Sequence, residues 1–417
     1  MKQNKNIPEG YKDSPLGIIP DEWEIKRLGS ITTKIGSGVT PRGGESVYKK
    51  EGRIFLRSQN IGWGTLLLND VAYIDETTHQ KQSSTEVQEG DILLNITGAS
   101  IGRSAVADKR VDKGNVNQHV CIIRLRDNIL PYYINAYILS YQGQRAIDSF
   151  QAGGNRQGLN FEQISTFYIP IPPLFEQKTI ASVLSIWDKA IEKQTTLIEK
   201  LEVRKRGLIQ QLLTGKKRLP GFEGKWKICK IKEIAQEISL KNRTHKKLIV
   251  LSCTKYEGLV PSLEYFGRQI FSNDISNYKI VPQYHFAYAT NHIEEGSIGY
   301  QATYTEALIS PMYTVFKIYE HIINNTFLYV LLKTPIYISE YKKRMEGSIN
   351  RRGGLKWNEF SNISVKTPPI EEQIAIVNFI IAIDREIIFE KNKLQQLKNE
   401  KKGLMQVLLT GKKRVFF

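Results

Sequence analysis

The sequence predicts an α+β protein in which two mixed α/β domains are separated by two long helices, which form an antiparallel coiled coil with pseudo-two-fold symmetry. Three observations lead to this fold class. One long segment occurs twice, each copy carries apolar residues at coiled-coil spacing, and the remaining segments are richer in Gly, Thr, Tyr and β-branched residues. We expect domains at residues 1–171 and 219–367, and helical regions at 172–218 and 368–417.

The repeat is defined by two motifs. Residues 172–177, PPLFEQ, recur at 368–373 as PPIEEQ, and residues 212–218, LLTGKKR, recur unchanged at 408–414. Both offsets are 196 residues (368 − 172 and 408 − 212), so the stretches between the motifs match without a gap. The prolines and the Thr-Gly pair are typical start and stop signals of a helix.

Between the motifs, apolar residues alternate at four- and three-residue steps, which indicates a coiled-coil seam. Gln194 and Lys205 break the seam in the first copy, and Glu390 and Lys401 break it at the same positions in the second. At 1.5 Å per residue, each helix is about 60 Å long. The seam residues are Ile180, Leu184, Trp187, Ile191, Ile198, Leu201 and Leu208, and Ile376, Ile380, Ile383, Ile387, Leu394, Leu397 and Leu404.

The lengths of the segments predict the direction of the second helix. A domain of about 150 residues has a radius of gyration near 15 Å, so it does not return the chain along a ~60 Å helix. The second helix therefore begins near the end of the first, and the two helices run antiparallel.

The globular segments share weaker similarities. Ser100-Ile101-Gly102 corresponds to Ser297-Ile298-Gly299, and we interpret both as hairpin turns because Gly permits the backbone of a turn.

Composition narrows the function. Lys and Arg number 59 against 42 Asp and Glu, a net charge of +17, which favours a polyanionic partner and leaves DNA, RNA and an anionic membrane surface open. The charge excess gathers at the carboxyl ends of the two helices, where it either complements the helix dipole or faces phosphates. Apolar runs are too short to span a bilayer, and the amino terminus has no secretory pattern, so we expect a cytoplasmic protein. The three cysteines, at 121, 229 and 253, have neither disulfide-framework nor zinc spacing.

Sequence signatures of catalysis are missing. Gln210 stands where a phosphate-binding loop ending at Gly215-Lys216 would need Gly, so this motif indicates a helix end. The Pro-Pro pairs follow Ile171 and Thr367, whereas an amino-methyltransferase needs Asn or Asp there. No His has metal-ligand spacing. We therefore expect no catalytic residues, no metal and no cofactor bound by this chain.

Polar residues in expected loops are candidates for DNA contact. Arg pairs bidentately with guanine, and Asn or Gln with adenine, although polar loops are commonly only solvated. The candidates are Arg42, Arg57, Gln59, Asn60, Asn117, Gln118, Asn155 and Arg156 in the first domain, and Lys241, Arg243, Lys246, Lys247, Lys255, Asn291, Asn350, Arg351 and Arg352 in the second.

The repeated PPxxEQ start, the seam and the LLTGKKR end closely resemble the helical regions of the specificity subunit of type I restriction-modification systems. The segments 11–17 leading to Trp23, and 218–222 leading to Trp226, are similar to that family's entries into its target recognition domains. The resemblance spans the whole chain.

The resemblance implies a non-catalytic DNA reader. Each target recognition domain would read one half of a bipartite, asymmetric site, while the helices set the spacing and dock two methyltransferase subunits. S-adenosylmethionine, ATP and Mg²⁺ would enter through those subunits and through restriction subunits that translocate and cleave DNA. The alternative is a coiled-coil scaffold without base readout, which would leave the charge and the two divergent domains unexplained.

Overall fold

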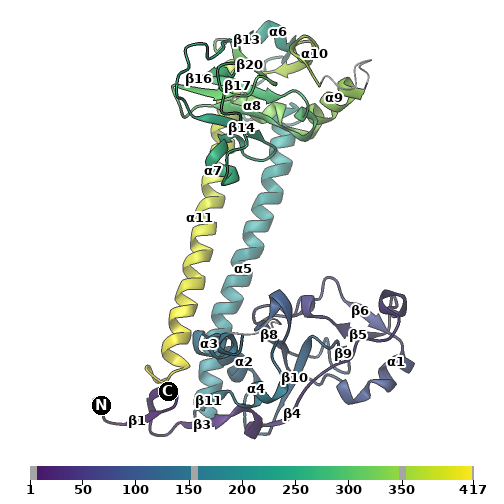
Figure 1. Ribbon diagram of the computed structural model, residues 1–417, viewed down its shortest axis with the longest axis vertical. Helices are drawn as coiled ribbons and strands as arrows, with labels where there is room; N and C mark the ends of the chain where they lie inside the picture. The colour runs from purple at the N-terminus through teal and green to yellow at the C-terminus, as the bar shows by residue number, and fades with distance from the viewer. Residues whose placement is uncertain (1–6, 152–157, 347–353, 416–417) are drawn as a thin grey trace. The chain divides into compact units, whose positions relative to one another are not determined.

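The structure is a computed structural model that describes residues 7–151, 158–346 and 354–415 (Figure 1). The chain divides into two compact units. Unit 1 comprises residues 1–196 and 392–417, and unit 2 comprises residues 197–391. Helices α5 (Leu174–Leu213) and α11 (Ile370–Leu408) each contribute residues to both units. The two units are described in turn.

Unit 1 is built around an antiparallel sheet with the strand order β4-β10-β7-β8. A second sheet, β6-β5-β9, pairs β5 with β9 in parallel. The remaining strands form the hairpin β1-β2 and the pair β3-β11. The strands are β1 (Tyr11–Ser14), β2 (Gly17–Pro20), β3 (Glu24–Arg27), β4 (Thr32–Ser37), β5 (Arg53–Leu56), β6 (Ala72–Ile74), β7 (Ile92–Asn95), β8 (Ser104–Val106), β9 (Asn115–Val116), β10 (Val120–Leu125) and β11 (Tyr168–Ile171).

The other helices of unit 1 are short. The α-helices are α1 (Glu76–Lys81), α2 (Pro131–Leu139), α3 (Tyr141–Ser149) and α4 (Phe161–Ser165). The 3₁₀ turns are η1 (Leu28–Ile31), η2 (Gly44–Val47), η3 (Ser58–Asn60), η4 (Ser83–Thr85) and η5 (Gly98–Ser100).

Unit 2 has an antiparallel sheet with the order β13-β20-β17-β18 and a second sheet with the order β15-β14-β19-β16. The pair β12-β21 completes its strands. The strands are β12 (Lys227–Lys230), β13 (Ala235–Ile238), β14 (Val250–Thr254), β15 (Gly258–Pro261), β16 (Lys279–Pro282), β17 (His285–Ala289), β18 (Ile298–Gln301), β19 (Glu306–Ile309), β20 (Tyr313–Ile318) and β21 (Ser364–Thr367). The helices are α6 (Ile231–Ile234), α7 (Ser262–Phe266), η6 (Ile293–Glu295), α8 (Asn325–Leu332), α9 (Pro335–Glu346) and α10 (Trp357–Phe360).

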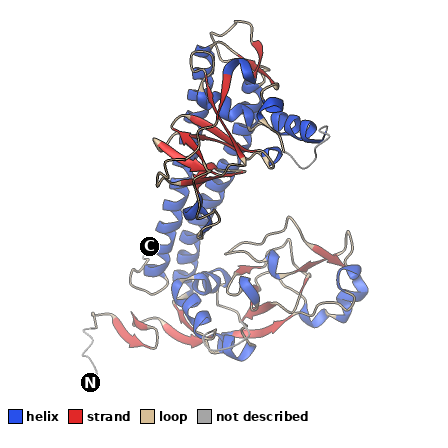
Figure 2. Cartoon of the chain, turned by 45° about the horizontal axis from the view of Figure 1, so that its top comes forward, coloured by secondary structure: helices blue, strands red, loops and turns tan. Residues whose placement is uncertain are grey.

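The two units share one topology. In each, a four-stranded antiparallel sheet is accompanied by a second sheet that contains one parallel pair, β5 with β9 in unit 1 and β14 with β19 in unit 2. Short helices accompany the strands of both units (Figure 2). Among the described residues, unit 2 adds β16 to its second sheet, and unit 1 adds the hairpin β1-β2. The weak sequence similarity between the domains therefore conceals a common fold.

One proposed correspondence between the domains is wrong. Gly102 lies in a turn with φ +84, as expected, two residues before the start of β8. Gly299 instead lies inside strand β18, where a Cβ atom would approach Leu259 Cγ to 2.5 Å. Close packing of Leu259, and not a turn, requires glycine at this position.

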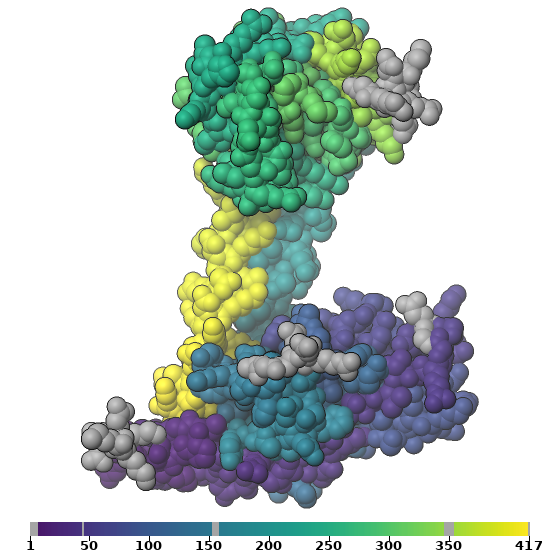
Figure 3. Space-filling model, viewed as in Figure 1, coloured from purple at the N-terminus to yellow at the C-terminus, as the bar shows by residue number. Residues whose placement is uncertain are grey.

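The core of each unit includes both long helices. In unit 1, Ile180 of α5 and Leu408 of α11 belong to the same buried cluster as Trp23. In unit 2, Leu212 of α5 and Ile376 of α11 belong to a buried cluster with sheet and helix residues. Figure 3 shows one face of the described residues as a space-filling surface. Each such fully buried apolar side chain contributes about 1.5–3 kcal/mol, so the helices are part of the cores.

The helices begin and end as the repeat predicts. Helices α5 and α11 contain 40 and 39 residues, and each starts directly after its Pro-Pro pair. Gly215 and Gly411, both at φ +70, follow the helices. The amide of Lys217 then donates to Gln211 O at 3.2 Å, and that of Lys413 to Val407 O at 3.1 Å. This pattern closes a helix at a left-handed glycine.

The seam is buried along both helices. All the predicted seam residues are buried or half-buried, and the two seam lysines form ion pairs across the helices. Lys401 pairs with Asp188 in unit 1, and Lys205 pairs with Asp384 in unit 2. The residue numbers of paired groups run in opposite directions: Glu202 of α5 pairs with Lys391 of α11 and Lys205 with Asp384, and in unit 1 Glu176 pairs with Arg414 and Asp188 with Lys401. The antiparallel direction of the helices and the predicted fold class are confirmed.

Among the residues that the structure describes, no helix is long and apolar enough to cross a membrane.

Candidate nucleic-acid interface

A buried carboxylate joins the helices to the globular part of unit 1. Glu176, 4% exposed, accepts hydrogen bonds from Trp23 Nε1 at 2.9 Å and from Arg414 Nε at 2.8 Å. Arg414 also donates to Glu22 Oε2 at 2.7 Å, and its hydrogen bond to Glu176 raises the pKa of the guanidinium. Because these residues come from three distant parts of the chain, they fix the domain on the helix pair.

Unit 2 repeats this arrangement. Glu372, fully buried, accepts from Trp226 Nε1 at 3.2 Å and from Arg218 Nη2 at 2.6 Å. Arg218 Nη1 also donates to Gly224 O at 2.9 Å. The Glu and Arg positions differ by 196 residues between the units, the same offset as the sequence repeat. We call each set of Trp, Glu and Arg a clasp.

The neighbouring glutamine of each long helix bonds to the residue just before a short helix of the globular part, α2 in unit 1 and α8 in unit 2. Gln177 Oε1 accepts from Leu130 N at 2.9 Å, just before α2. Gln373 Oε1 accepts from Asn324 N at 2.8 Å, just before α8. The Glu-Gln dipeptide of the repeated motif thus connects the helix pair to the domain in both units.

The first group of predicted DNA contacts lies around η3 of unit 1. Arg57 Nη2 stands 3.5 Å from Asp70 Oδ2, and exposed Gln59 donates its Nε2 to the same atom at 2.8 Å. Asn60 is 1% exposed, and its amide bonds to Arg57 N, Leu67 O and Asp70 O. Its hydrogen-bonding groups therefore hold the loop closed, and we leave Asn60 out of the candidate interface.

The second group lies between β9 and β10. Asn117 is buried, and its Oδ1 accepts from His119 N at 3.1 Å, whereas Gln118 is exposed. Thr40 donates to Gln118 Oε1, and Gln118 Nε2 stands 3.2 Å from His119 Nε2. Asn117 therefore shapes this turn, while Gln118 lies at its surface. Arg42, in the turn after β4, is also exposed.

Sequence reasoning missed a polar cavity that connects these groups. The cavity has a volume of about 410 Å³. Arg103 was not among the predicted residues, although it directly follows the Ser-Ile-Gly motif that the sequence marks as a turn. The lining residues are Ser58, Gln59, Thr97, Gly98, Ala99, Ser100, Arg103 and His119.

In unit 2, the predicted residues lie in three exposed or half-exposed loops. Lys241, Arg243, Lys246 and Lys247 surround the buried Asn242, whose Oδ1 accepts from the Lys246 amide at 2.9 Å. This buried asparagine therefore holds the basic loop in place. Lys246 also pairs with Glu306 at 2.7 Å.

The other two loops are smaller. Lys255 Nζ lies 5.2 Å from the ring centre of Tyr256, which is 81% exposed. Asn291 Oδ1 accepts from Thr290 Oγ1 at 3.1 Å. The remaining candidates, Asn155, Arg156, Asn350, Arg351 and Arg352, lie outside the described residues.

The sheet registers show which side chains occupy equivalent positions. Arg103 directly precedes β8, and Ser297 directly precedes β18 in unit 2. His119 directly precedes β10, and Met312 directly precedes β20. Where unit 1 has the side chains of Arg103 and His119 at this edge of its sheet, unit 2 therefore has those of Ser297 and Met312.

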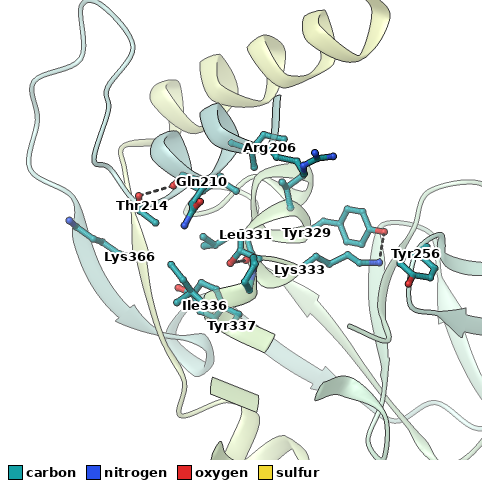
Figure 4. Close-up of a pocket in the computed structure, with 15 residues that line it drawn as sticks. Arg206, Gln210, Thr214, Tyr256, Tyr329, Leu331, Lys333, Ile336, Tyr337 and Lys366 are labelled. Carbon is teal, nitrogen blue, oxygen red and sulfur yellow. Dashed lines mark hydrogen bonds between the residues drawn. The ribbon is translucent and has the colours of Figure 1, made fainter. Parts of the chain in front are cut away.

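Two further features of unit 2 were not expected. His292, Glu294 and Glu295 place their ligand atoms within 4.8 Å of one another, but acidic surface groups of this kind commonly occur without a metal. A cavity of about 660 Å³ lies between α5, α8 and α9 (Figure 4). Burial lowers the pKa of Lys333, whose Nζ stands 3.4 Å from Tyr329 Oη in this cavity.

Comparison with known proteins agrees with this architecture. The family described as type I restriction modification DNA specificity domain matches residues 20–203 and again residues 223–399. A Methanocaldococcus jannaschii protein, named putative type I restriction enzyme MjaX specificity subunit, is 26% identical over 98% of this chain and 97% of its own length. The type I restriction enzyme MjaVIII specificity subunit of the same organism is 23% identical over 98% of this chain and 96% of its own.

Solved structures share the fold. A chain of a type I R-M system, solved to explain its assembly and conformational transition, has a TM-score of 0.62 at 15% identity, covering 94% of this chain and 99% of the other. The HsdS subunit from Thermoanaerobacter tengcongensis has a TM-score of 0.55 at 16% identity, covering 94% of this chain and 98% of its own.

The family matches well over half of the chain, once in each half, so this chain belongs to the type I restriction modification DNA specificity family. The resemblance drawn from the helical motifs is confirmed, and so is the function as a specificity subunit with two recognition domains.

Proposed function

We propose that the two domains of this specificity subunit read the two different halves of one bipartite DNA site, and that the helix pair sets the distance between the halves. One observation carries the proposal. The units repeat the same sheet order and the same clasp, yet differ at the equivalent positions Arg103 and Ser297, and His119 and Met312. A shared frame with different edges suits two modules that bind the same polymer but read different sequences.

The net charge of +17 supports a DNA partner, because phosphate contacts by Lys and Arg dominate the affinity of DNA-binding proteins. Exposed basic residues of unit 2, among them Arg243 and Lys247, are suited to phosphate contacts. A scaffold without DNA contact would need neither this charge nor two unlike edges.

Chemistry in the proposed complex belongs to other subunits. Two methyltransferase subunits would dock on this chain and supply S-adenosylmethionine, and restriction subunits would supply ATP- and Mg²⁺-dependent translocation and cleavage. This chain would contribute no catalytic residue. Its part would be to choose the DNA sequence.

The test uses the full chain together with the methyltransferase subunits of its own system. We expect S-adenosylmethionine-dependent methylation of adenines at one bipartite sequence with two unlike halves, and no methylation or cleavage by the chain alone. Sequencing of methylated genomic DNA identifies the methylated sites. Incubation of DNA with the purified chain, S-adenosylmethionine, ATP and Mg²⁺ tests for methylation or cleavage by the chain alone. Methyl transfer by this polypeptide alone, or methylation without sequence preference, would refute the proposal.

A further inference from the structure

The polar cavity of unit 1 is open to solvent, and the charges of its lining side chains are unbalanced. Its lining includes the side chains of Gln59, Thr97, Arg103 and His119, and no Asp or Glu is among the lining residues. An open surface without negative charge, lined by an arginine, favours a ligand that presents hydrogen-bond acceptors. The chemistry of the individual groups narrows the ligand further.

Arg103 is held in place from both sides of its backbone. Its amide donates to Ser100 O at 3.2 Å, and its carbonyl accepts from Asn95 N at 2.8 Å. Gly102, at φ +84, makes the turn that delivers Arg103 to the cavity. The buried Nε atom of Arg103 has no hydrogen-bond partner in the described part of the chain. Because this Nε is buried, the Nη atoms of Arg103, which lines the cavity, are the donors that can reach an external acceptor.

Gln59 supplies an acceptor to the same cavity. Its Nε2 donates to Asp70 Oδ2 at 2.8 Å. Because a carboxylate only accepts, this bond assigns the amide orientation and directs Oε1 away from Asp70. The cavity therefore offers Arg donors and a Gln acceptor together.

His119 completes the pattern. Gln118 Nε2, which only donates, stands 3.2 Å from His119 Nε2, so that ring nitrogen is the acceptor. His119 Nδ1 then carries the proton and donates to Thr97 Oγ1 at 2.6 Å, which leaves the Thr97 hydroxyl hydrogen available as a further donor.

We propose that this cavity reads a G·C base pair, with Arg103 donating to the guanine and Gln59 accepting from the cytosine. The major-groove edge of this pair presents guanine O6 and N7 as acceptors and the cytosine N4 amino group as a donor. A phosphate presents only acceptors and would leave Gln59 Oε1 unmatched. This inference rests on the proposed function, because it names the base pair that the first domain reads.

The decisive variants are Arg103→Ala and Arg103→Lys, studied in the full chain with its methyltransferase subunits. Lysine retains the charge but loses the planar, bidentate donors of arginine. Arg53→Ala is the matched control, because Arg53 belongs to the same unit and already donates to Glu76 at 2.9 Å. Selection of bound sequences from a randomised duplex library measures the preference at every position of both half-sites.

We expect both Arg103 variants to lose about 5- to 150-fold of guanine preference at one position of one half-site. The other half-site and the Arg53 control should keep their preferences. A uniform loss of affinity, with every preference retained, would reassign Arg103 to a phosphate and overturn the inference. Unchanged preference in both variants would also overturn it.

The experiment separates this inference from the proposed function. If the unmodified complex selects no sequence, the proposed function fails and the inference fails with it. If the unmodified complex selects a bipartite sequence and the Arg103 variants behave as the unmodified chain, only the inference fails. Circular dichroism of each variant confirms that the fold is retained, and the Lys variant tests the assignment should the Ala variant unfold.

Discussion

Unit 1 and unit 2 have the same frame and different edges. The frame consists of the four-stranded sheet, the seam and the clasp, and its key residues recur 196 positions apart, as with Glu176 and Glu372. The edges, represented by Arg103 in unit 1 and Ser297 in unit 2, differ in charge and size. The two units therefore share the contacts that attach each domain to the helix pair, and they differ in the loops at the edge of the sheet.

The clasps also differ in one respect. Arg414 divides its hydrogen bonds between Glu176 and Glu22, whereas Arg218 bonds to Glu372 and to the carbonyl of Gly224. The clasp of unit 1 therefore has a second carboxylate, and that of unit 2 relies on one. This difference allows the comparison to be tested.

The largest expected effect follows from exchange of a whole recognition domain. Replacing residues 219–367 with the matching domain of a relative should change one half-site completely and leave the other intact, because the frame of unit 1 is untouched. Mapping of methylated sites in cells that contain the chimaera and its methyltransferase subunits gives the result. If both half-sites changed, the domains would not be independent readers.

Removal of the clasp carboxylate should destabilise unit 2 more than unit 1. Glu372→Ala leaves Trp226 Nε1 without its acceptor and Arg218 without its ion partner, and we expect a loss of about 3 kcal/mol. Glu176→Ala should cost about 2 kcal/mol, because Arg414 keeps Glu22.

Two cysteines report the opening of each unit separately. Burial raises the pKa of buried Cys121 in unit 1 and of half-buried Cys253 in unit 2 to about 12, so each thiol should react slowly with a labelling reagent in the folded unit and faster after local opening. The rate of thiol labelling in mild urea therefore measures the two losses. Glu371→Ala, at an exposed neighbouring position, is the control and should change stability by less than about 1 kcal/mol. Equal losses for both clasp variants would contradict the difference between the clasps.

A smaller effect is expected from lengthening the element that the units share. Four residues inserted after Lys193 of α5 add about 6 Å and rotate the following residues by only ~40°, so the seam should survive as a local stutter. The preferred gap between half-sites should lengthen by about one or two base pairs. Methylation mapping should show both half-sites unchanged. An unaltered gap would argue against the helices as the ruler.

The two long helices were predictable from the sequence, and the candidate nucleic-acid interface was predictable only in part. The seam was found because helical periodicity is a local pattern, and its residues from Ile180 to Leu404 are all buried or half-buried. Asn60 resembled a DNA-reading residue in the sequence, but three backbone contacts occupy its amide. Arg103 carried no signal beyond its position after a turn, because only the folded loops from residues 58, 97 and 119 create a cavity around it.

By itself, the sequence determined the repeat, the two helices, their stops at Gly215 and Gly411, and the family. These features depend on spacing along the chain, and spacing is preserved in the order of residues. Only the tertiary structure decided the clasp, which brings Trp23, Glu176 and Arg414 together, and the equivalence of the two sheets. Such contacts join residues more than 150 positions apart, where each residue type has many possible partners and only packing of the whole unit selects one.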